Sequence, residues 1–131
     1  MYRMLLLTLL YATLTGCGQT PISVSGKVTL DGNPVERGTI TFEAQDKQTA
    51  NAGGVVTQGA YSVKDIPPGK KTVRITGLKV TGERLSIATD PNSKKIEDTV
   101  PIVPARFNDQ SDLVRDVTTS TTMDFDLKTK P

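Results

Sequence analysis

The stretch SVSGKVTLDGNPVERGTITF, residues 23–42, carries the strongest secondary-structure signal in this chain of 131 residues. Polar and apolar residues alternate on both sides of a short interruption, and the inward-facing positions are Val24, Val28, Ile40 and Phe42. A period of two is what a strand with one buried face requires. The interruption, DGNP at residues 31–34, combines residues that tolerate positive φ with a proline that cannot donate to a ladder. We therefore predict a β-hairpin or a β-arch over this stretch.

The same alternation recurs in shorter segments toward the C-terminus. Met123, Phe125 and Leu127 alternate with two aspartates, and we expect this last strand to enter the same core as the first. No segment shows an apolar stripe at helical spacing. About seven short strands, with turn signals at intervals of roughly ten residues, predict an all-β fold, an antiparallel β-sandwich over residues 22–128.

Residues 81–100, TGERLSIATDPNSKKIEDTV, are the least regular part of the chain. The stretch is too long for an ordinary hairpin loop, and long loops in compact domains are often functional or mobile. We expect a loop whose apolar residues form a small satellite strand or pack over one sheet edge. A short helix over residues 93–98 is the alternative.

The first 16 residues predict a signal peptide. Arg3 precedes a leucine-rich run that is shorter than the ~20 apolar residues a membrane span needs. The run ends in LTGC, residues 14–17, which resembles the bacterial lipobox at all four positions. The resemblance implies cleavage between Gly16 and Cys17, and acylation of Cys17, the only cysteine of the chain. The alternative is an ordinary secretory signal with a chance cysteine.

Residues 17–21 then form the lipidated cysteine and a short polar tether, which holds the domain close to the membrane surface. Several acyl chains together give stable anchoring. Gly18 follows the cysteine where aspartate often marks retention in the inner membrane. We therefore expect a lipid anchor in the cell envelope, with the outer membrane, on its periplasmic or outward face, favoured over the inner membrane.

Three stretches together resemble transthyretin-like, carboxypeptidase-regulatory-like β-sandwich domains, which are also called prealbumin-like. They are VSGKVTLDGNPV at residues 24–35, GAYSV with IPPGKKTVRI at residues 59–63 and 66–75, and DFDL at residues 124–127. The segment IVPARFNDQSDL, residues 102–113, resembles part of small lipoproteins from planctomycete-type bacteria, most of which have no known function. The resemblance implies a fold but no activity, because the matching residues are turn formers and core residues.

Composition excludes several classes of function. A formal net charge of +2 provides no strong field for nucleic acid, and three Phe, three Tyr and no Trp supply a poor stacking platform for bases. The absence of histidine removes the Ser-His-Asp arrangement and the commonest zinc ligand. Asp124 and Asp126 face outward on the predicted last strand, where acidic residues usually protect an edge from aggregation. We therefore predict no enzyme activity.

The segment NDQSD, residues 108–112, offers oxygen ligands of the kind calcium prefers, and the alternative is an Asx-type turn. Because it has no glycine and no distal glutamate, we predict no metal site and no cofactor. Just before it, Arg106 lies beside an aromatic residue, which is typical of hot spots in protein interfaces. We name Arg106, Phe107 and Asn108 as candidate interaction residues. The alternative is that Phe107 closes one end of the core.

Five basic residues gather around one predicted strand: Lys70, Lys71, Arg74, Lys79 and Arg84. Such a cluster suits anionic lipid or cell-wall polymer, and the alternative is a solvated strand face.

Taken together, these features predict a membrane-anchored, non-enzymatic lipoprotein of the cell envelope that acts as a structural or protein-interaction module. Its predicted partners are the lipid bilayer, through acylated Cys17, and envelope proteins or cell-wall polymer. Binding would use residues 81–100 and 104–112 at one end of the domain. The alternative function is a carbohydrate- or calcium-binding β-sandwich module at the cell surface.

Overall fold

The computed structural model describes residues 20–131, so the predicted signal peptide and Cys17 lie outside the described residues. The described chain forms ten strands and one 3₁₀ turn. They are β1 (Ile22–Leu30), β2 (Asn33–Pro34), β3 (Arg37–Ala44), β4 (Ala52–Thr57), β5 (Ala60–Ile66), β6 (Gly69–Leu85), β7 (Lys95–Pro101), η1 (Ala105–Phe107), β8 (Val114–Val117), β9 (Thr121–Thr122) and β10 (Phe125–Leu127). All ten strands belong to one hydrogen-bonded sheet, in which the order β10-β1-β5-β4-β3-β6-β7 forms the main path. The prediction of an all-β fold is therefore confirmed.

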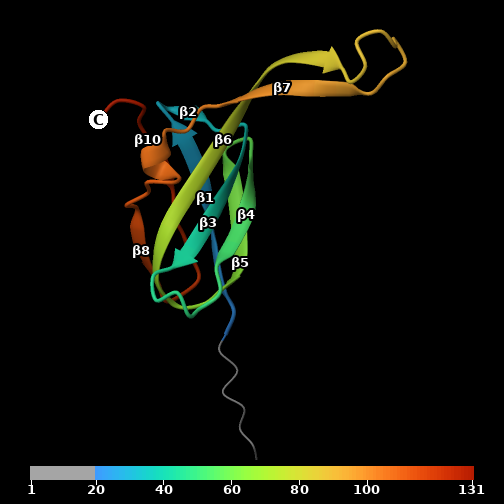
Figure 1. The fold of residues 1–131 in the computed structure, drawn as a ribbon. Coiled ribbons are helices and arrows are strands. Elements are labelled where there is room, and N and C mark those ends of the chain that lie inside the picture. Colours follow the sequence, from blue (N-terminus) through green and yellow to red (C-terminus); the bar gives the residue numbers. More distant parts are fainter. Residues whose placement is uncertain (1–19) are drawn as a thin grey trace, which may run out of the picture.

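The sheet curls because a short connection links its two sides. β8 pairs with the first residues of β6 on the edge opposite β3, while β9 and β10 pair with β1 at the other side of the sheet. Only residues 118–120 separate β8 from β9, so the chain must bring these two sides together. Figure 1 shows β8 and β10 near each other, with β6 crossing in front of β1 and β3.

The core lies inside this curl and follows the predicted alternation. The inward positions of β1 and β3 are fully buried, namely Val24, Val28, Ile40 and Phe42. Phe125 and Leu127 of β10 are also buried and belong to the same cluster, as the sequence predicts. Burial of this apolar surface contributes roughly 25 cal/mol per Å² to the free energy of folding.

The turn after β1 is a tight β-hairpin turn, one of the two predicted alternatives, and the strand that it pairs with β1 is the two-residue β2. Asp31 and Gly32 have φ values of 51° and 84°, and the chain reverses there to pair Leu30 with Asn33. That pairing ends at Pro34. The chain then crosses to another part of the sheet, where β3 pairs with β4 and β6 and not with β1.

The direction of the C-terminal pairing differs from the antiparallel arrangement expected from the sequence. β9 and β10 both run parallel to β1, whereas the other ladders are antiparallel. β9 also lies in a stretch that reads as a polar turn. Alternation in a sequence reports which face of a strand is buried, and it holds no information on the partner strand or its direction.

Candidate interaction site

The most prominent external feature is a hairpin arm formed by the second half of β6 and by β7. The two strands pair from Leu78 with Pro101 to Leu85 with Lys95, and they project beyond the sheet, as Figure 1 shows. The arm carries most of the large apolar side chains that the described chain exposes to solvent. These are Leu78, Ile87, Ile96 and Val100, with Val55 and Val114 elsewhere.

Side-chain contacts hold the arm in shape, although an isolated two-stranded hairpin is only marginally stable in water. Arg84 and Asp98 form an ion pair of 2.8 Å across the ribbon. At its tip, the Ser93 hydroxyl donates to the Ile87 carbonyl at 3.1 Å and accepts from the Ile87 amide at 3.2 Å. From the sheet, the Arg37 guanidinium of β3 pairs with the Glu97 carboxylate of β7. The arm is therefore a defined ribbon that is tied to the sheet.

Residues 81–100 are not the expected irregular loop, because they form the outer parts of β6 and β7 and the turn between them. The expected satellite strand is present in part, since Ile96 and Val100 lie in β7. The alternative helix at residues 93–98 is also absent, since this segment enters β7. The apolar alternation that marks half-buried strands is missing because both faces of the arm are solvated. Two features of the sequence do indicate a hairpin here. One is the turn sequence DPNS at residues 90–93, and the other is the set of charged residues on either side of it, which pair across the two strands.

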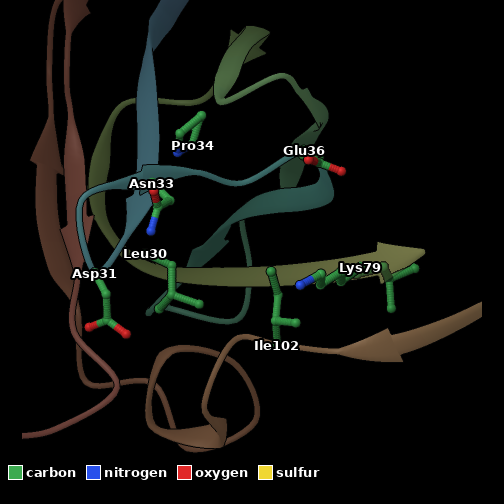
Figure 2. Close-up of a pocket in the computed structure, with 8 residues that line it drawn as sticks. Leu30, Asp31, Asn33, Pro34, Glu36, Lys79 and Ile102 are labelled. Carbon is green, nitrogen blue, oxygen red and sulfur yellow. The ribbon is translucent and has the colours of Figure 1, made fainter. Parts of the chain in front are cut away.

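An open pocket of about 310 Å³ lies at the base of the arm. Figure 2 shows Asp31 and Lys79 flanking Leu30 and Ile102 along its wall. The pocket thus joins the end of β1 to the root of the arm. Its lining combines apolar side chains with charges of both signs, which suits a contact with a polypeptide better than a catalytic centre.

Asp31, one of the two acidic residues that line this pocket, is stabilised in its ionised form. The Asp31 carboxylate accepts hydrogen bonds from the hydroxyl and the amide of Thr129, at 2.6 Å and 2.9 Å. These bonds lower the pKa of Asp31 below its usual value. A carboxylate that is ionised and already bonded is a poor general acid at neutral pH. It serves to fasten the C-terminal segment beside the pocket.

The structure places the three predicted interaction residues at one end of the core. Arg106 donates a hydrogen bond to the Lys128 carbonyl, and its guanidinium lies 4.8 Å from the centre of the Phe107 ring. Phe107 is partly buried and packs against the core, as the alternative reading predicts. The Asn108 carbonyl accepts from Arg74 at 2.6 Å. These contacts tie the C-terminal half of the chain together, and they lie near the arm base.

Arg74 also bears on the calcium alternative. One nitrogen, Nη1, donates to the Asn108 and Asp109 carbonyls at 2.6 Å and 3.0 Å, while Nε pairs with Glu43. A fixed guanidinium therefore occupies backbone oxygens that a cation would need, and its charge opposes a second cation. The part of the chain that the structure describes holds no group of three or more His, Cys, Asp or Glu residues placed to bind a metal ion.

The two outward aspartates of the last strand have structural partners. Asp124 accepts from the Lys27 amide at 2.8 Å, and Asp126 accepts from the Thr29 hydroxyl at 2.9 Å. Hydrogen bonding to Thr29, together with nearby Lys128, lowers the pKa of Asp126. Both carboxylates thus fasten β10 to β1.

The predicted basic cluster is not one surface. Arg74 and Arg84 are paired with acidic residues, and Lys79 lines the pocket at the arm base. Lys71 is buried, with 1% of its surface exposed, on the inward-facing parity of β6. Its stem fills the core side of the sheet, and its charge acts on Asp46 in the neighbouring loop.

Asp46 provides a prediction for the pH dependence of stability. Its carboxylate accepts hydrogen bonds from the Thr49 hydroxyl and amide and from the Gln48 amide. These bonds lower its pKa from 3.8 to about 2. Because the pKa is lower in the folded state, the stabilisation is complete above the unfolded value and is lost as the pH falls through the folded one. Asp46→Asn should therefore melt at a lower temperature than the wild type at pH 7.

The difference in melting temperature should close between about pH 4 and pH 2. Thermal unfolding followed by circular dichroism over pH 2–7 measures it. Asp116→Asn, a change at an exposed aspartate on β8, is the charge-matched control. A difference for Asp46→Asn that stays constant across this pH range would contradict the assignment.

Comparisons with known proteins provide no family for the chain. No protein-family model matches it, and no curated protein matches it. Among solved structures, it is similar to a 9R-lipoxygenase from Cyanothece, with a TM-score of 0.37 and 12% sequence identity. The match covers 82% of this chain and 16% of the lipoxygenase chain. A similarity this weak carries no inference about activity. Within residues 20–131, no helix is long and apolar enough to cross a membrane.

Proposed function

We propose that the protein is a membrane-anchored, non-enzymatic lipoprotein of the cell envelope, and that it acts as a protein-interaction module through its hairpin arm. The observation that carries the proposal is the arm itself, a defined ribbon that exposes apolar side chains far from the core. Exposed apolar groups surrounded by polar ones mark interaction surfaces in soluble domains. The lipobox-like sequence at residues 14–17 supplies the anchor.

The direction of β1 relates the arm to the anchor. β1 begins at Ile22, five residues after Cys17, and its nine residues extend roughly 30 Å along the sheet. Its last residue, Leu30, lines the pocket at the arm base. The arm thus leaves the domain at the end opposite the start of β1, as Figure 1 shows. A domain anchored at Cys17 would present the arm away from the bilayer.

For the fold family, we favour the transthyretin-like sandwich. The support is the set of matching turn and core motifs, together with a curled sheet whose strands enclose one core. For the function, the protein-interaction reading is favoured over carbohydrate binding. Sugar sites usually contain aromatic side chains. None lines the pocket at the arm base, and none lines a second open pocket, which lies between Ile22, Pro68 and residues 118–120.

Replacement of Cys17 by serine tests the anchor. The wild type should partition into the detergent phase and the Cys17→Ser variant into the aqueous phase, because the variant lacks the acyl acceptor. Phase separation of cell extracts followed by immunodetection measures the distribution. Thr20→Ser, a conservative change in the tether, is the control and should behave as the wild type. Equal detergent partition of Cys17→Ser and wild type would contradict the anchor.

Excision of the arm tests the interaction surface. Val80 and Thr99 lie directly opposite each other, so a two-residue Asn-Gly turn can join them in place of residues 81–98. The buried core includes no residue of the excised segment, and we therefore expect the variant to fold and to remain anchored. Partners crosslinked to the wild type in native membranes should be lost.

A double variant, Ile96→Ser with Val100→Ser, should weaken the same crosslinks without shortening the chain. Val55→Ser is the matched control, because Val55 is a 67% exposed apolar residue on β4, outside the arm. Crosslinks that persist in the excised variant would remove the arm from the proposal.

A further inference from the structure

The outer edge of β7 is open for strand pairing. β7 is the terminal strand of the sheet, and among residues 20–131 it pairs only with β6. The carbonyls of Lys94 and Asp98 accept from the β6 side, from the Ser86 amide and the Thr81 hydroxyl, and the Ile102 amide donates to Gly77 of β6. Backbone groups alternate in direction along a strand. The amides and carbonyls of the odd-numbered residues of β7 therefore point outward.

Few of the usual protective devices occur on this edge. Proline, bulges and covering loops commonly prevent edge strands from pairing with other chains. The bulge of the arm lies on β6, between Val80 and Gly82, and the only proline of β7 is its last residue, Pro101. The protection that remains on this edge is the charge of its side chains. The order of these charges along β7 disfavours some pairing registers and favours others.

We infer that the arm binds a second copy of this chain by antiparallel pairing of the two β7 edges, with Ile96 of one copy opposite Ile96 of the other. This inference rests on the proposed function of the arm and names its partner. The resulting pair has twofold symmetry and closes on itself, as most homodimers do.

Hydrogen-bond direction and charge together favour this register among those centred on residues 95–98, the charged part of β7. In an antiparallel ladder, outward-pointing residues must face outward-pointing residues, so Lys95 can oppose only an odd-numbered residue. Registers centred on Lys95, Glu97 or Asp98 place two like charges directly opposite each other, which is destabilising. The register centred on Ile96 places Lys95 opposite Glu97 and Lys94 opposite Asp98. By symmetry, each of these opposite-charge pairs occurs twice.

The side chains involved are exposed, and each would exchange an ion pair on its own copy for one with the second copy. Lys95 and Glu97 have side chains that are 73% and 40% exposed, and their pairs with Glu83 and Arg37 lie on the surface. Ile96 is 38% exposed, and in this register it meets its equivalent at a non-hydrogen-bonded position, where side chains approach most closely. Anchoring both copies to one membrane would raise their effective concentration, which offsets the small area of the contact.

A disulfide test measures the register directly. Ile96→Cys in the anchored, full-length protein should form a disulfide-linked dimer under mild oxidation in native membranes, because the two cysteines would face each other. Val100→Cys is the matched control, since Val100 is similarly exposed on the same face but is remote from its own equivalent in this register. The unsubstituted protein controls for any thiol at Cys17. Equal crosslinking of both variants, or of neither, would overturn the inference.

Charge reversal tests the pairing independently. Lys95→Glu and Glu97→Lys should each weaken self-association by more than about tenfold, because like charges then face each other. A mixture of the two variants should associate again, since each acidic residue then meets a lysine on the other copy. Co-purification of differently tagged copies measures both effects, and failure of the mixture to associate would overturn the inference.

These results are separable from the proposed function. If arm excision removes crosslinked partners of another sequence while Ile96→Cys yields no dimer, the arm is an interaction surface but the second copy is not its occupant. If the dimer forms and no other partner is lost on excision, self-association is the interaction that the arm performs.

Discussion

Phe42→Ala is expected to destabilise the folded domain by about 3–5 kcal/mol, a large part of the 5–15 kcal/mol typical of native proteins. Phe42 is completely buried on β3, between Ala52 of β4 and Val73 of β6. Truncation to alanine removes most of a large apolar side chain and leaves a cavity in a strand that neighbouring strands fix on both sides. Urea unfolding followed by circular dichroism measures the change in the free energy of unfolding.

The matched control for Phe42→Ala is Val55→Ala on the adjacent strand β4. Val55 is 67% exposed, and substitutions at exposed positions usually change stability by less than about 0.5 kcal/mol. A cost at Phe42 as small as that at Val55 would contradict the placement of the core. A change in the slope of the free energy of unfolding against urea concentration, with little change in the midpoint, would instead indicate that the compactness of the unfolded or the native state has changed.

Phe42 also shows what the sequence could predict. Alternation assigns it to the inward face of a strand, and Val24, Ile40 and Phe125 follow by the same rule. This prediction succeeds because the hydrophobic effect depends on which side of the strand a residue occupies, and that side is encoded locally. The turns at residues 31–32 and 58–59 could be predicted for a similar reason, since positive φ favours particular residue types.

Strand pairing could not be predicted, because it is decided between distant segments. Nothing in the residues of β10 states that it runs parallel to β1, and its partners lie almost a hundred residues away. The strands of the arm cannot be predicted for another reason. Its strands are held by backbone bonds and surface ion pairs such as Arg84 with Asp98, which leave no apolar period in the sequence.

The candidate site was predicted in part. The sequence predicts that residues 81–100 contribute to binding. In the structure this stretch forms strands of the arm, which carries most of the exposed large apolar side chains of the described chain. The sequence also indicates a contact between Arg106 and the neighbouring Phe107, and the Arg106 guanidinium carbon lies 4.8 Å from the centre of the Phe107 ring. The contacts of this pair are internal, however, because Arg106 binds the carbonyl of Lys128. A local motif cannot report whether its partners belong to the same chain.

Gly26→Ala is expected to detach the C-terminal segment from β1. A Cβ atom at position 26 would lie 1.9 Å from the Met123 carbonyl oxygen and 2.9 Å from an Asp124 carboxylate oxygen. The first contact is with backbone, so the segment itself must move. Three hydrogen bonds depend on its position: Met123 amide to Ser25 carbonyl at 2.9 Å, Tyr61 hydroxyl to Met123 carbonyl at 2.6 Å, and Lys27 amide to Asp124 at 2.8 Å.

The expected cost of Gly26→Ala is about 3–5 kcal/mol, since overpacking against fixed atoms adds to the loss of hydrogen bonds worth about 1 kcal/mol each. Hydrogen exchange should show lost protection in residues 121–127 before the rest of the sheet opens. Gly82→Ala is the control, because a Cβ atom there meets nothing within 4 Å. The two variants make the same chemical change, and only Gly26 has a neighbour that must yield. Equal stability of both would mean that β9 and β10 are not held against β1, and then Phe125 and Leu127 would no longer have a reason to be buried.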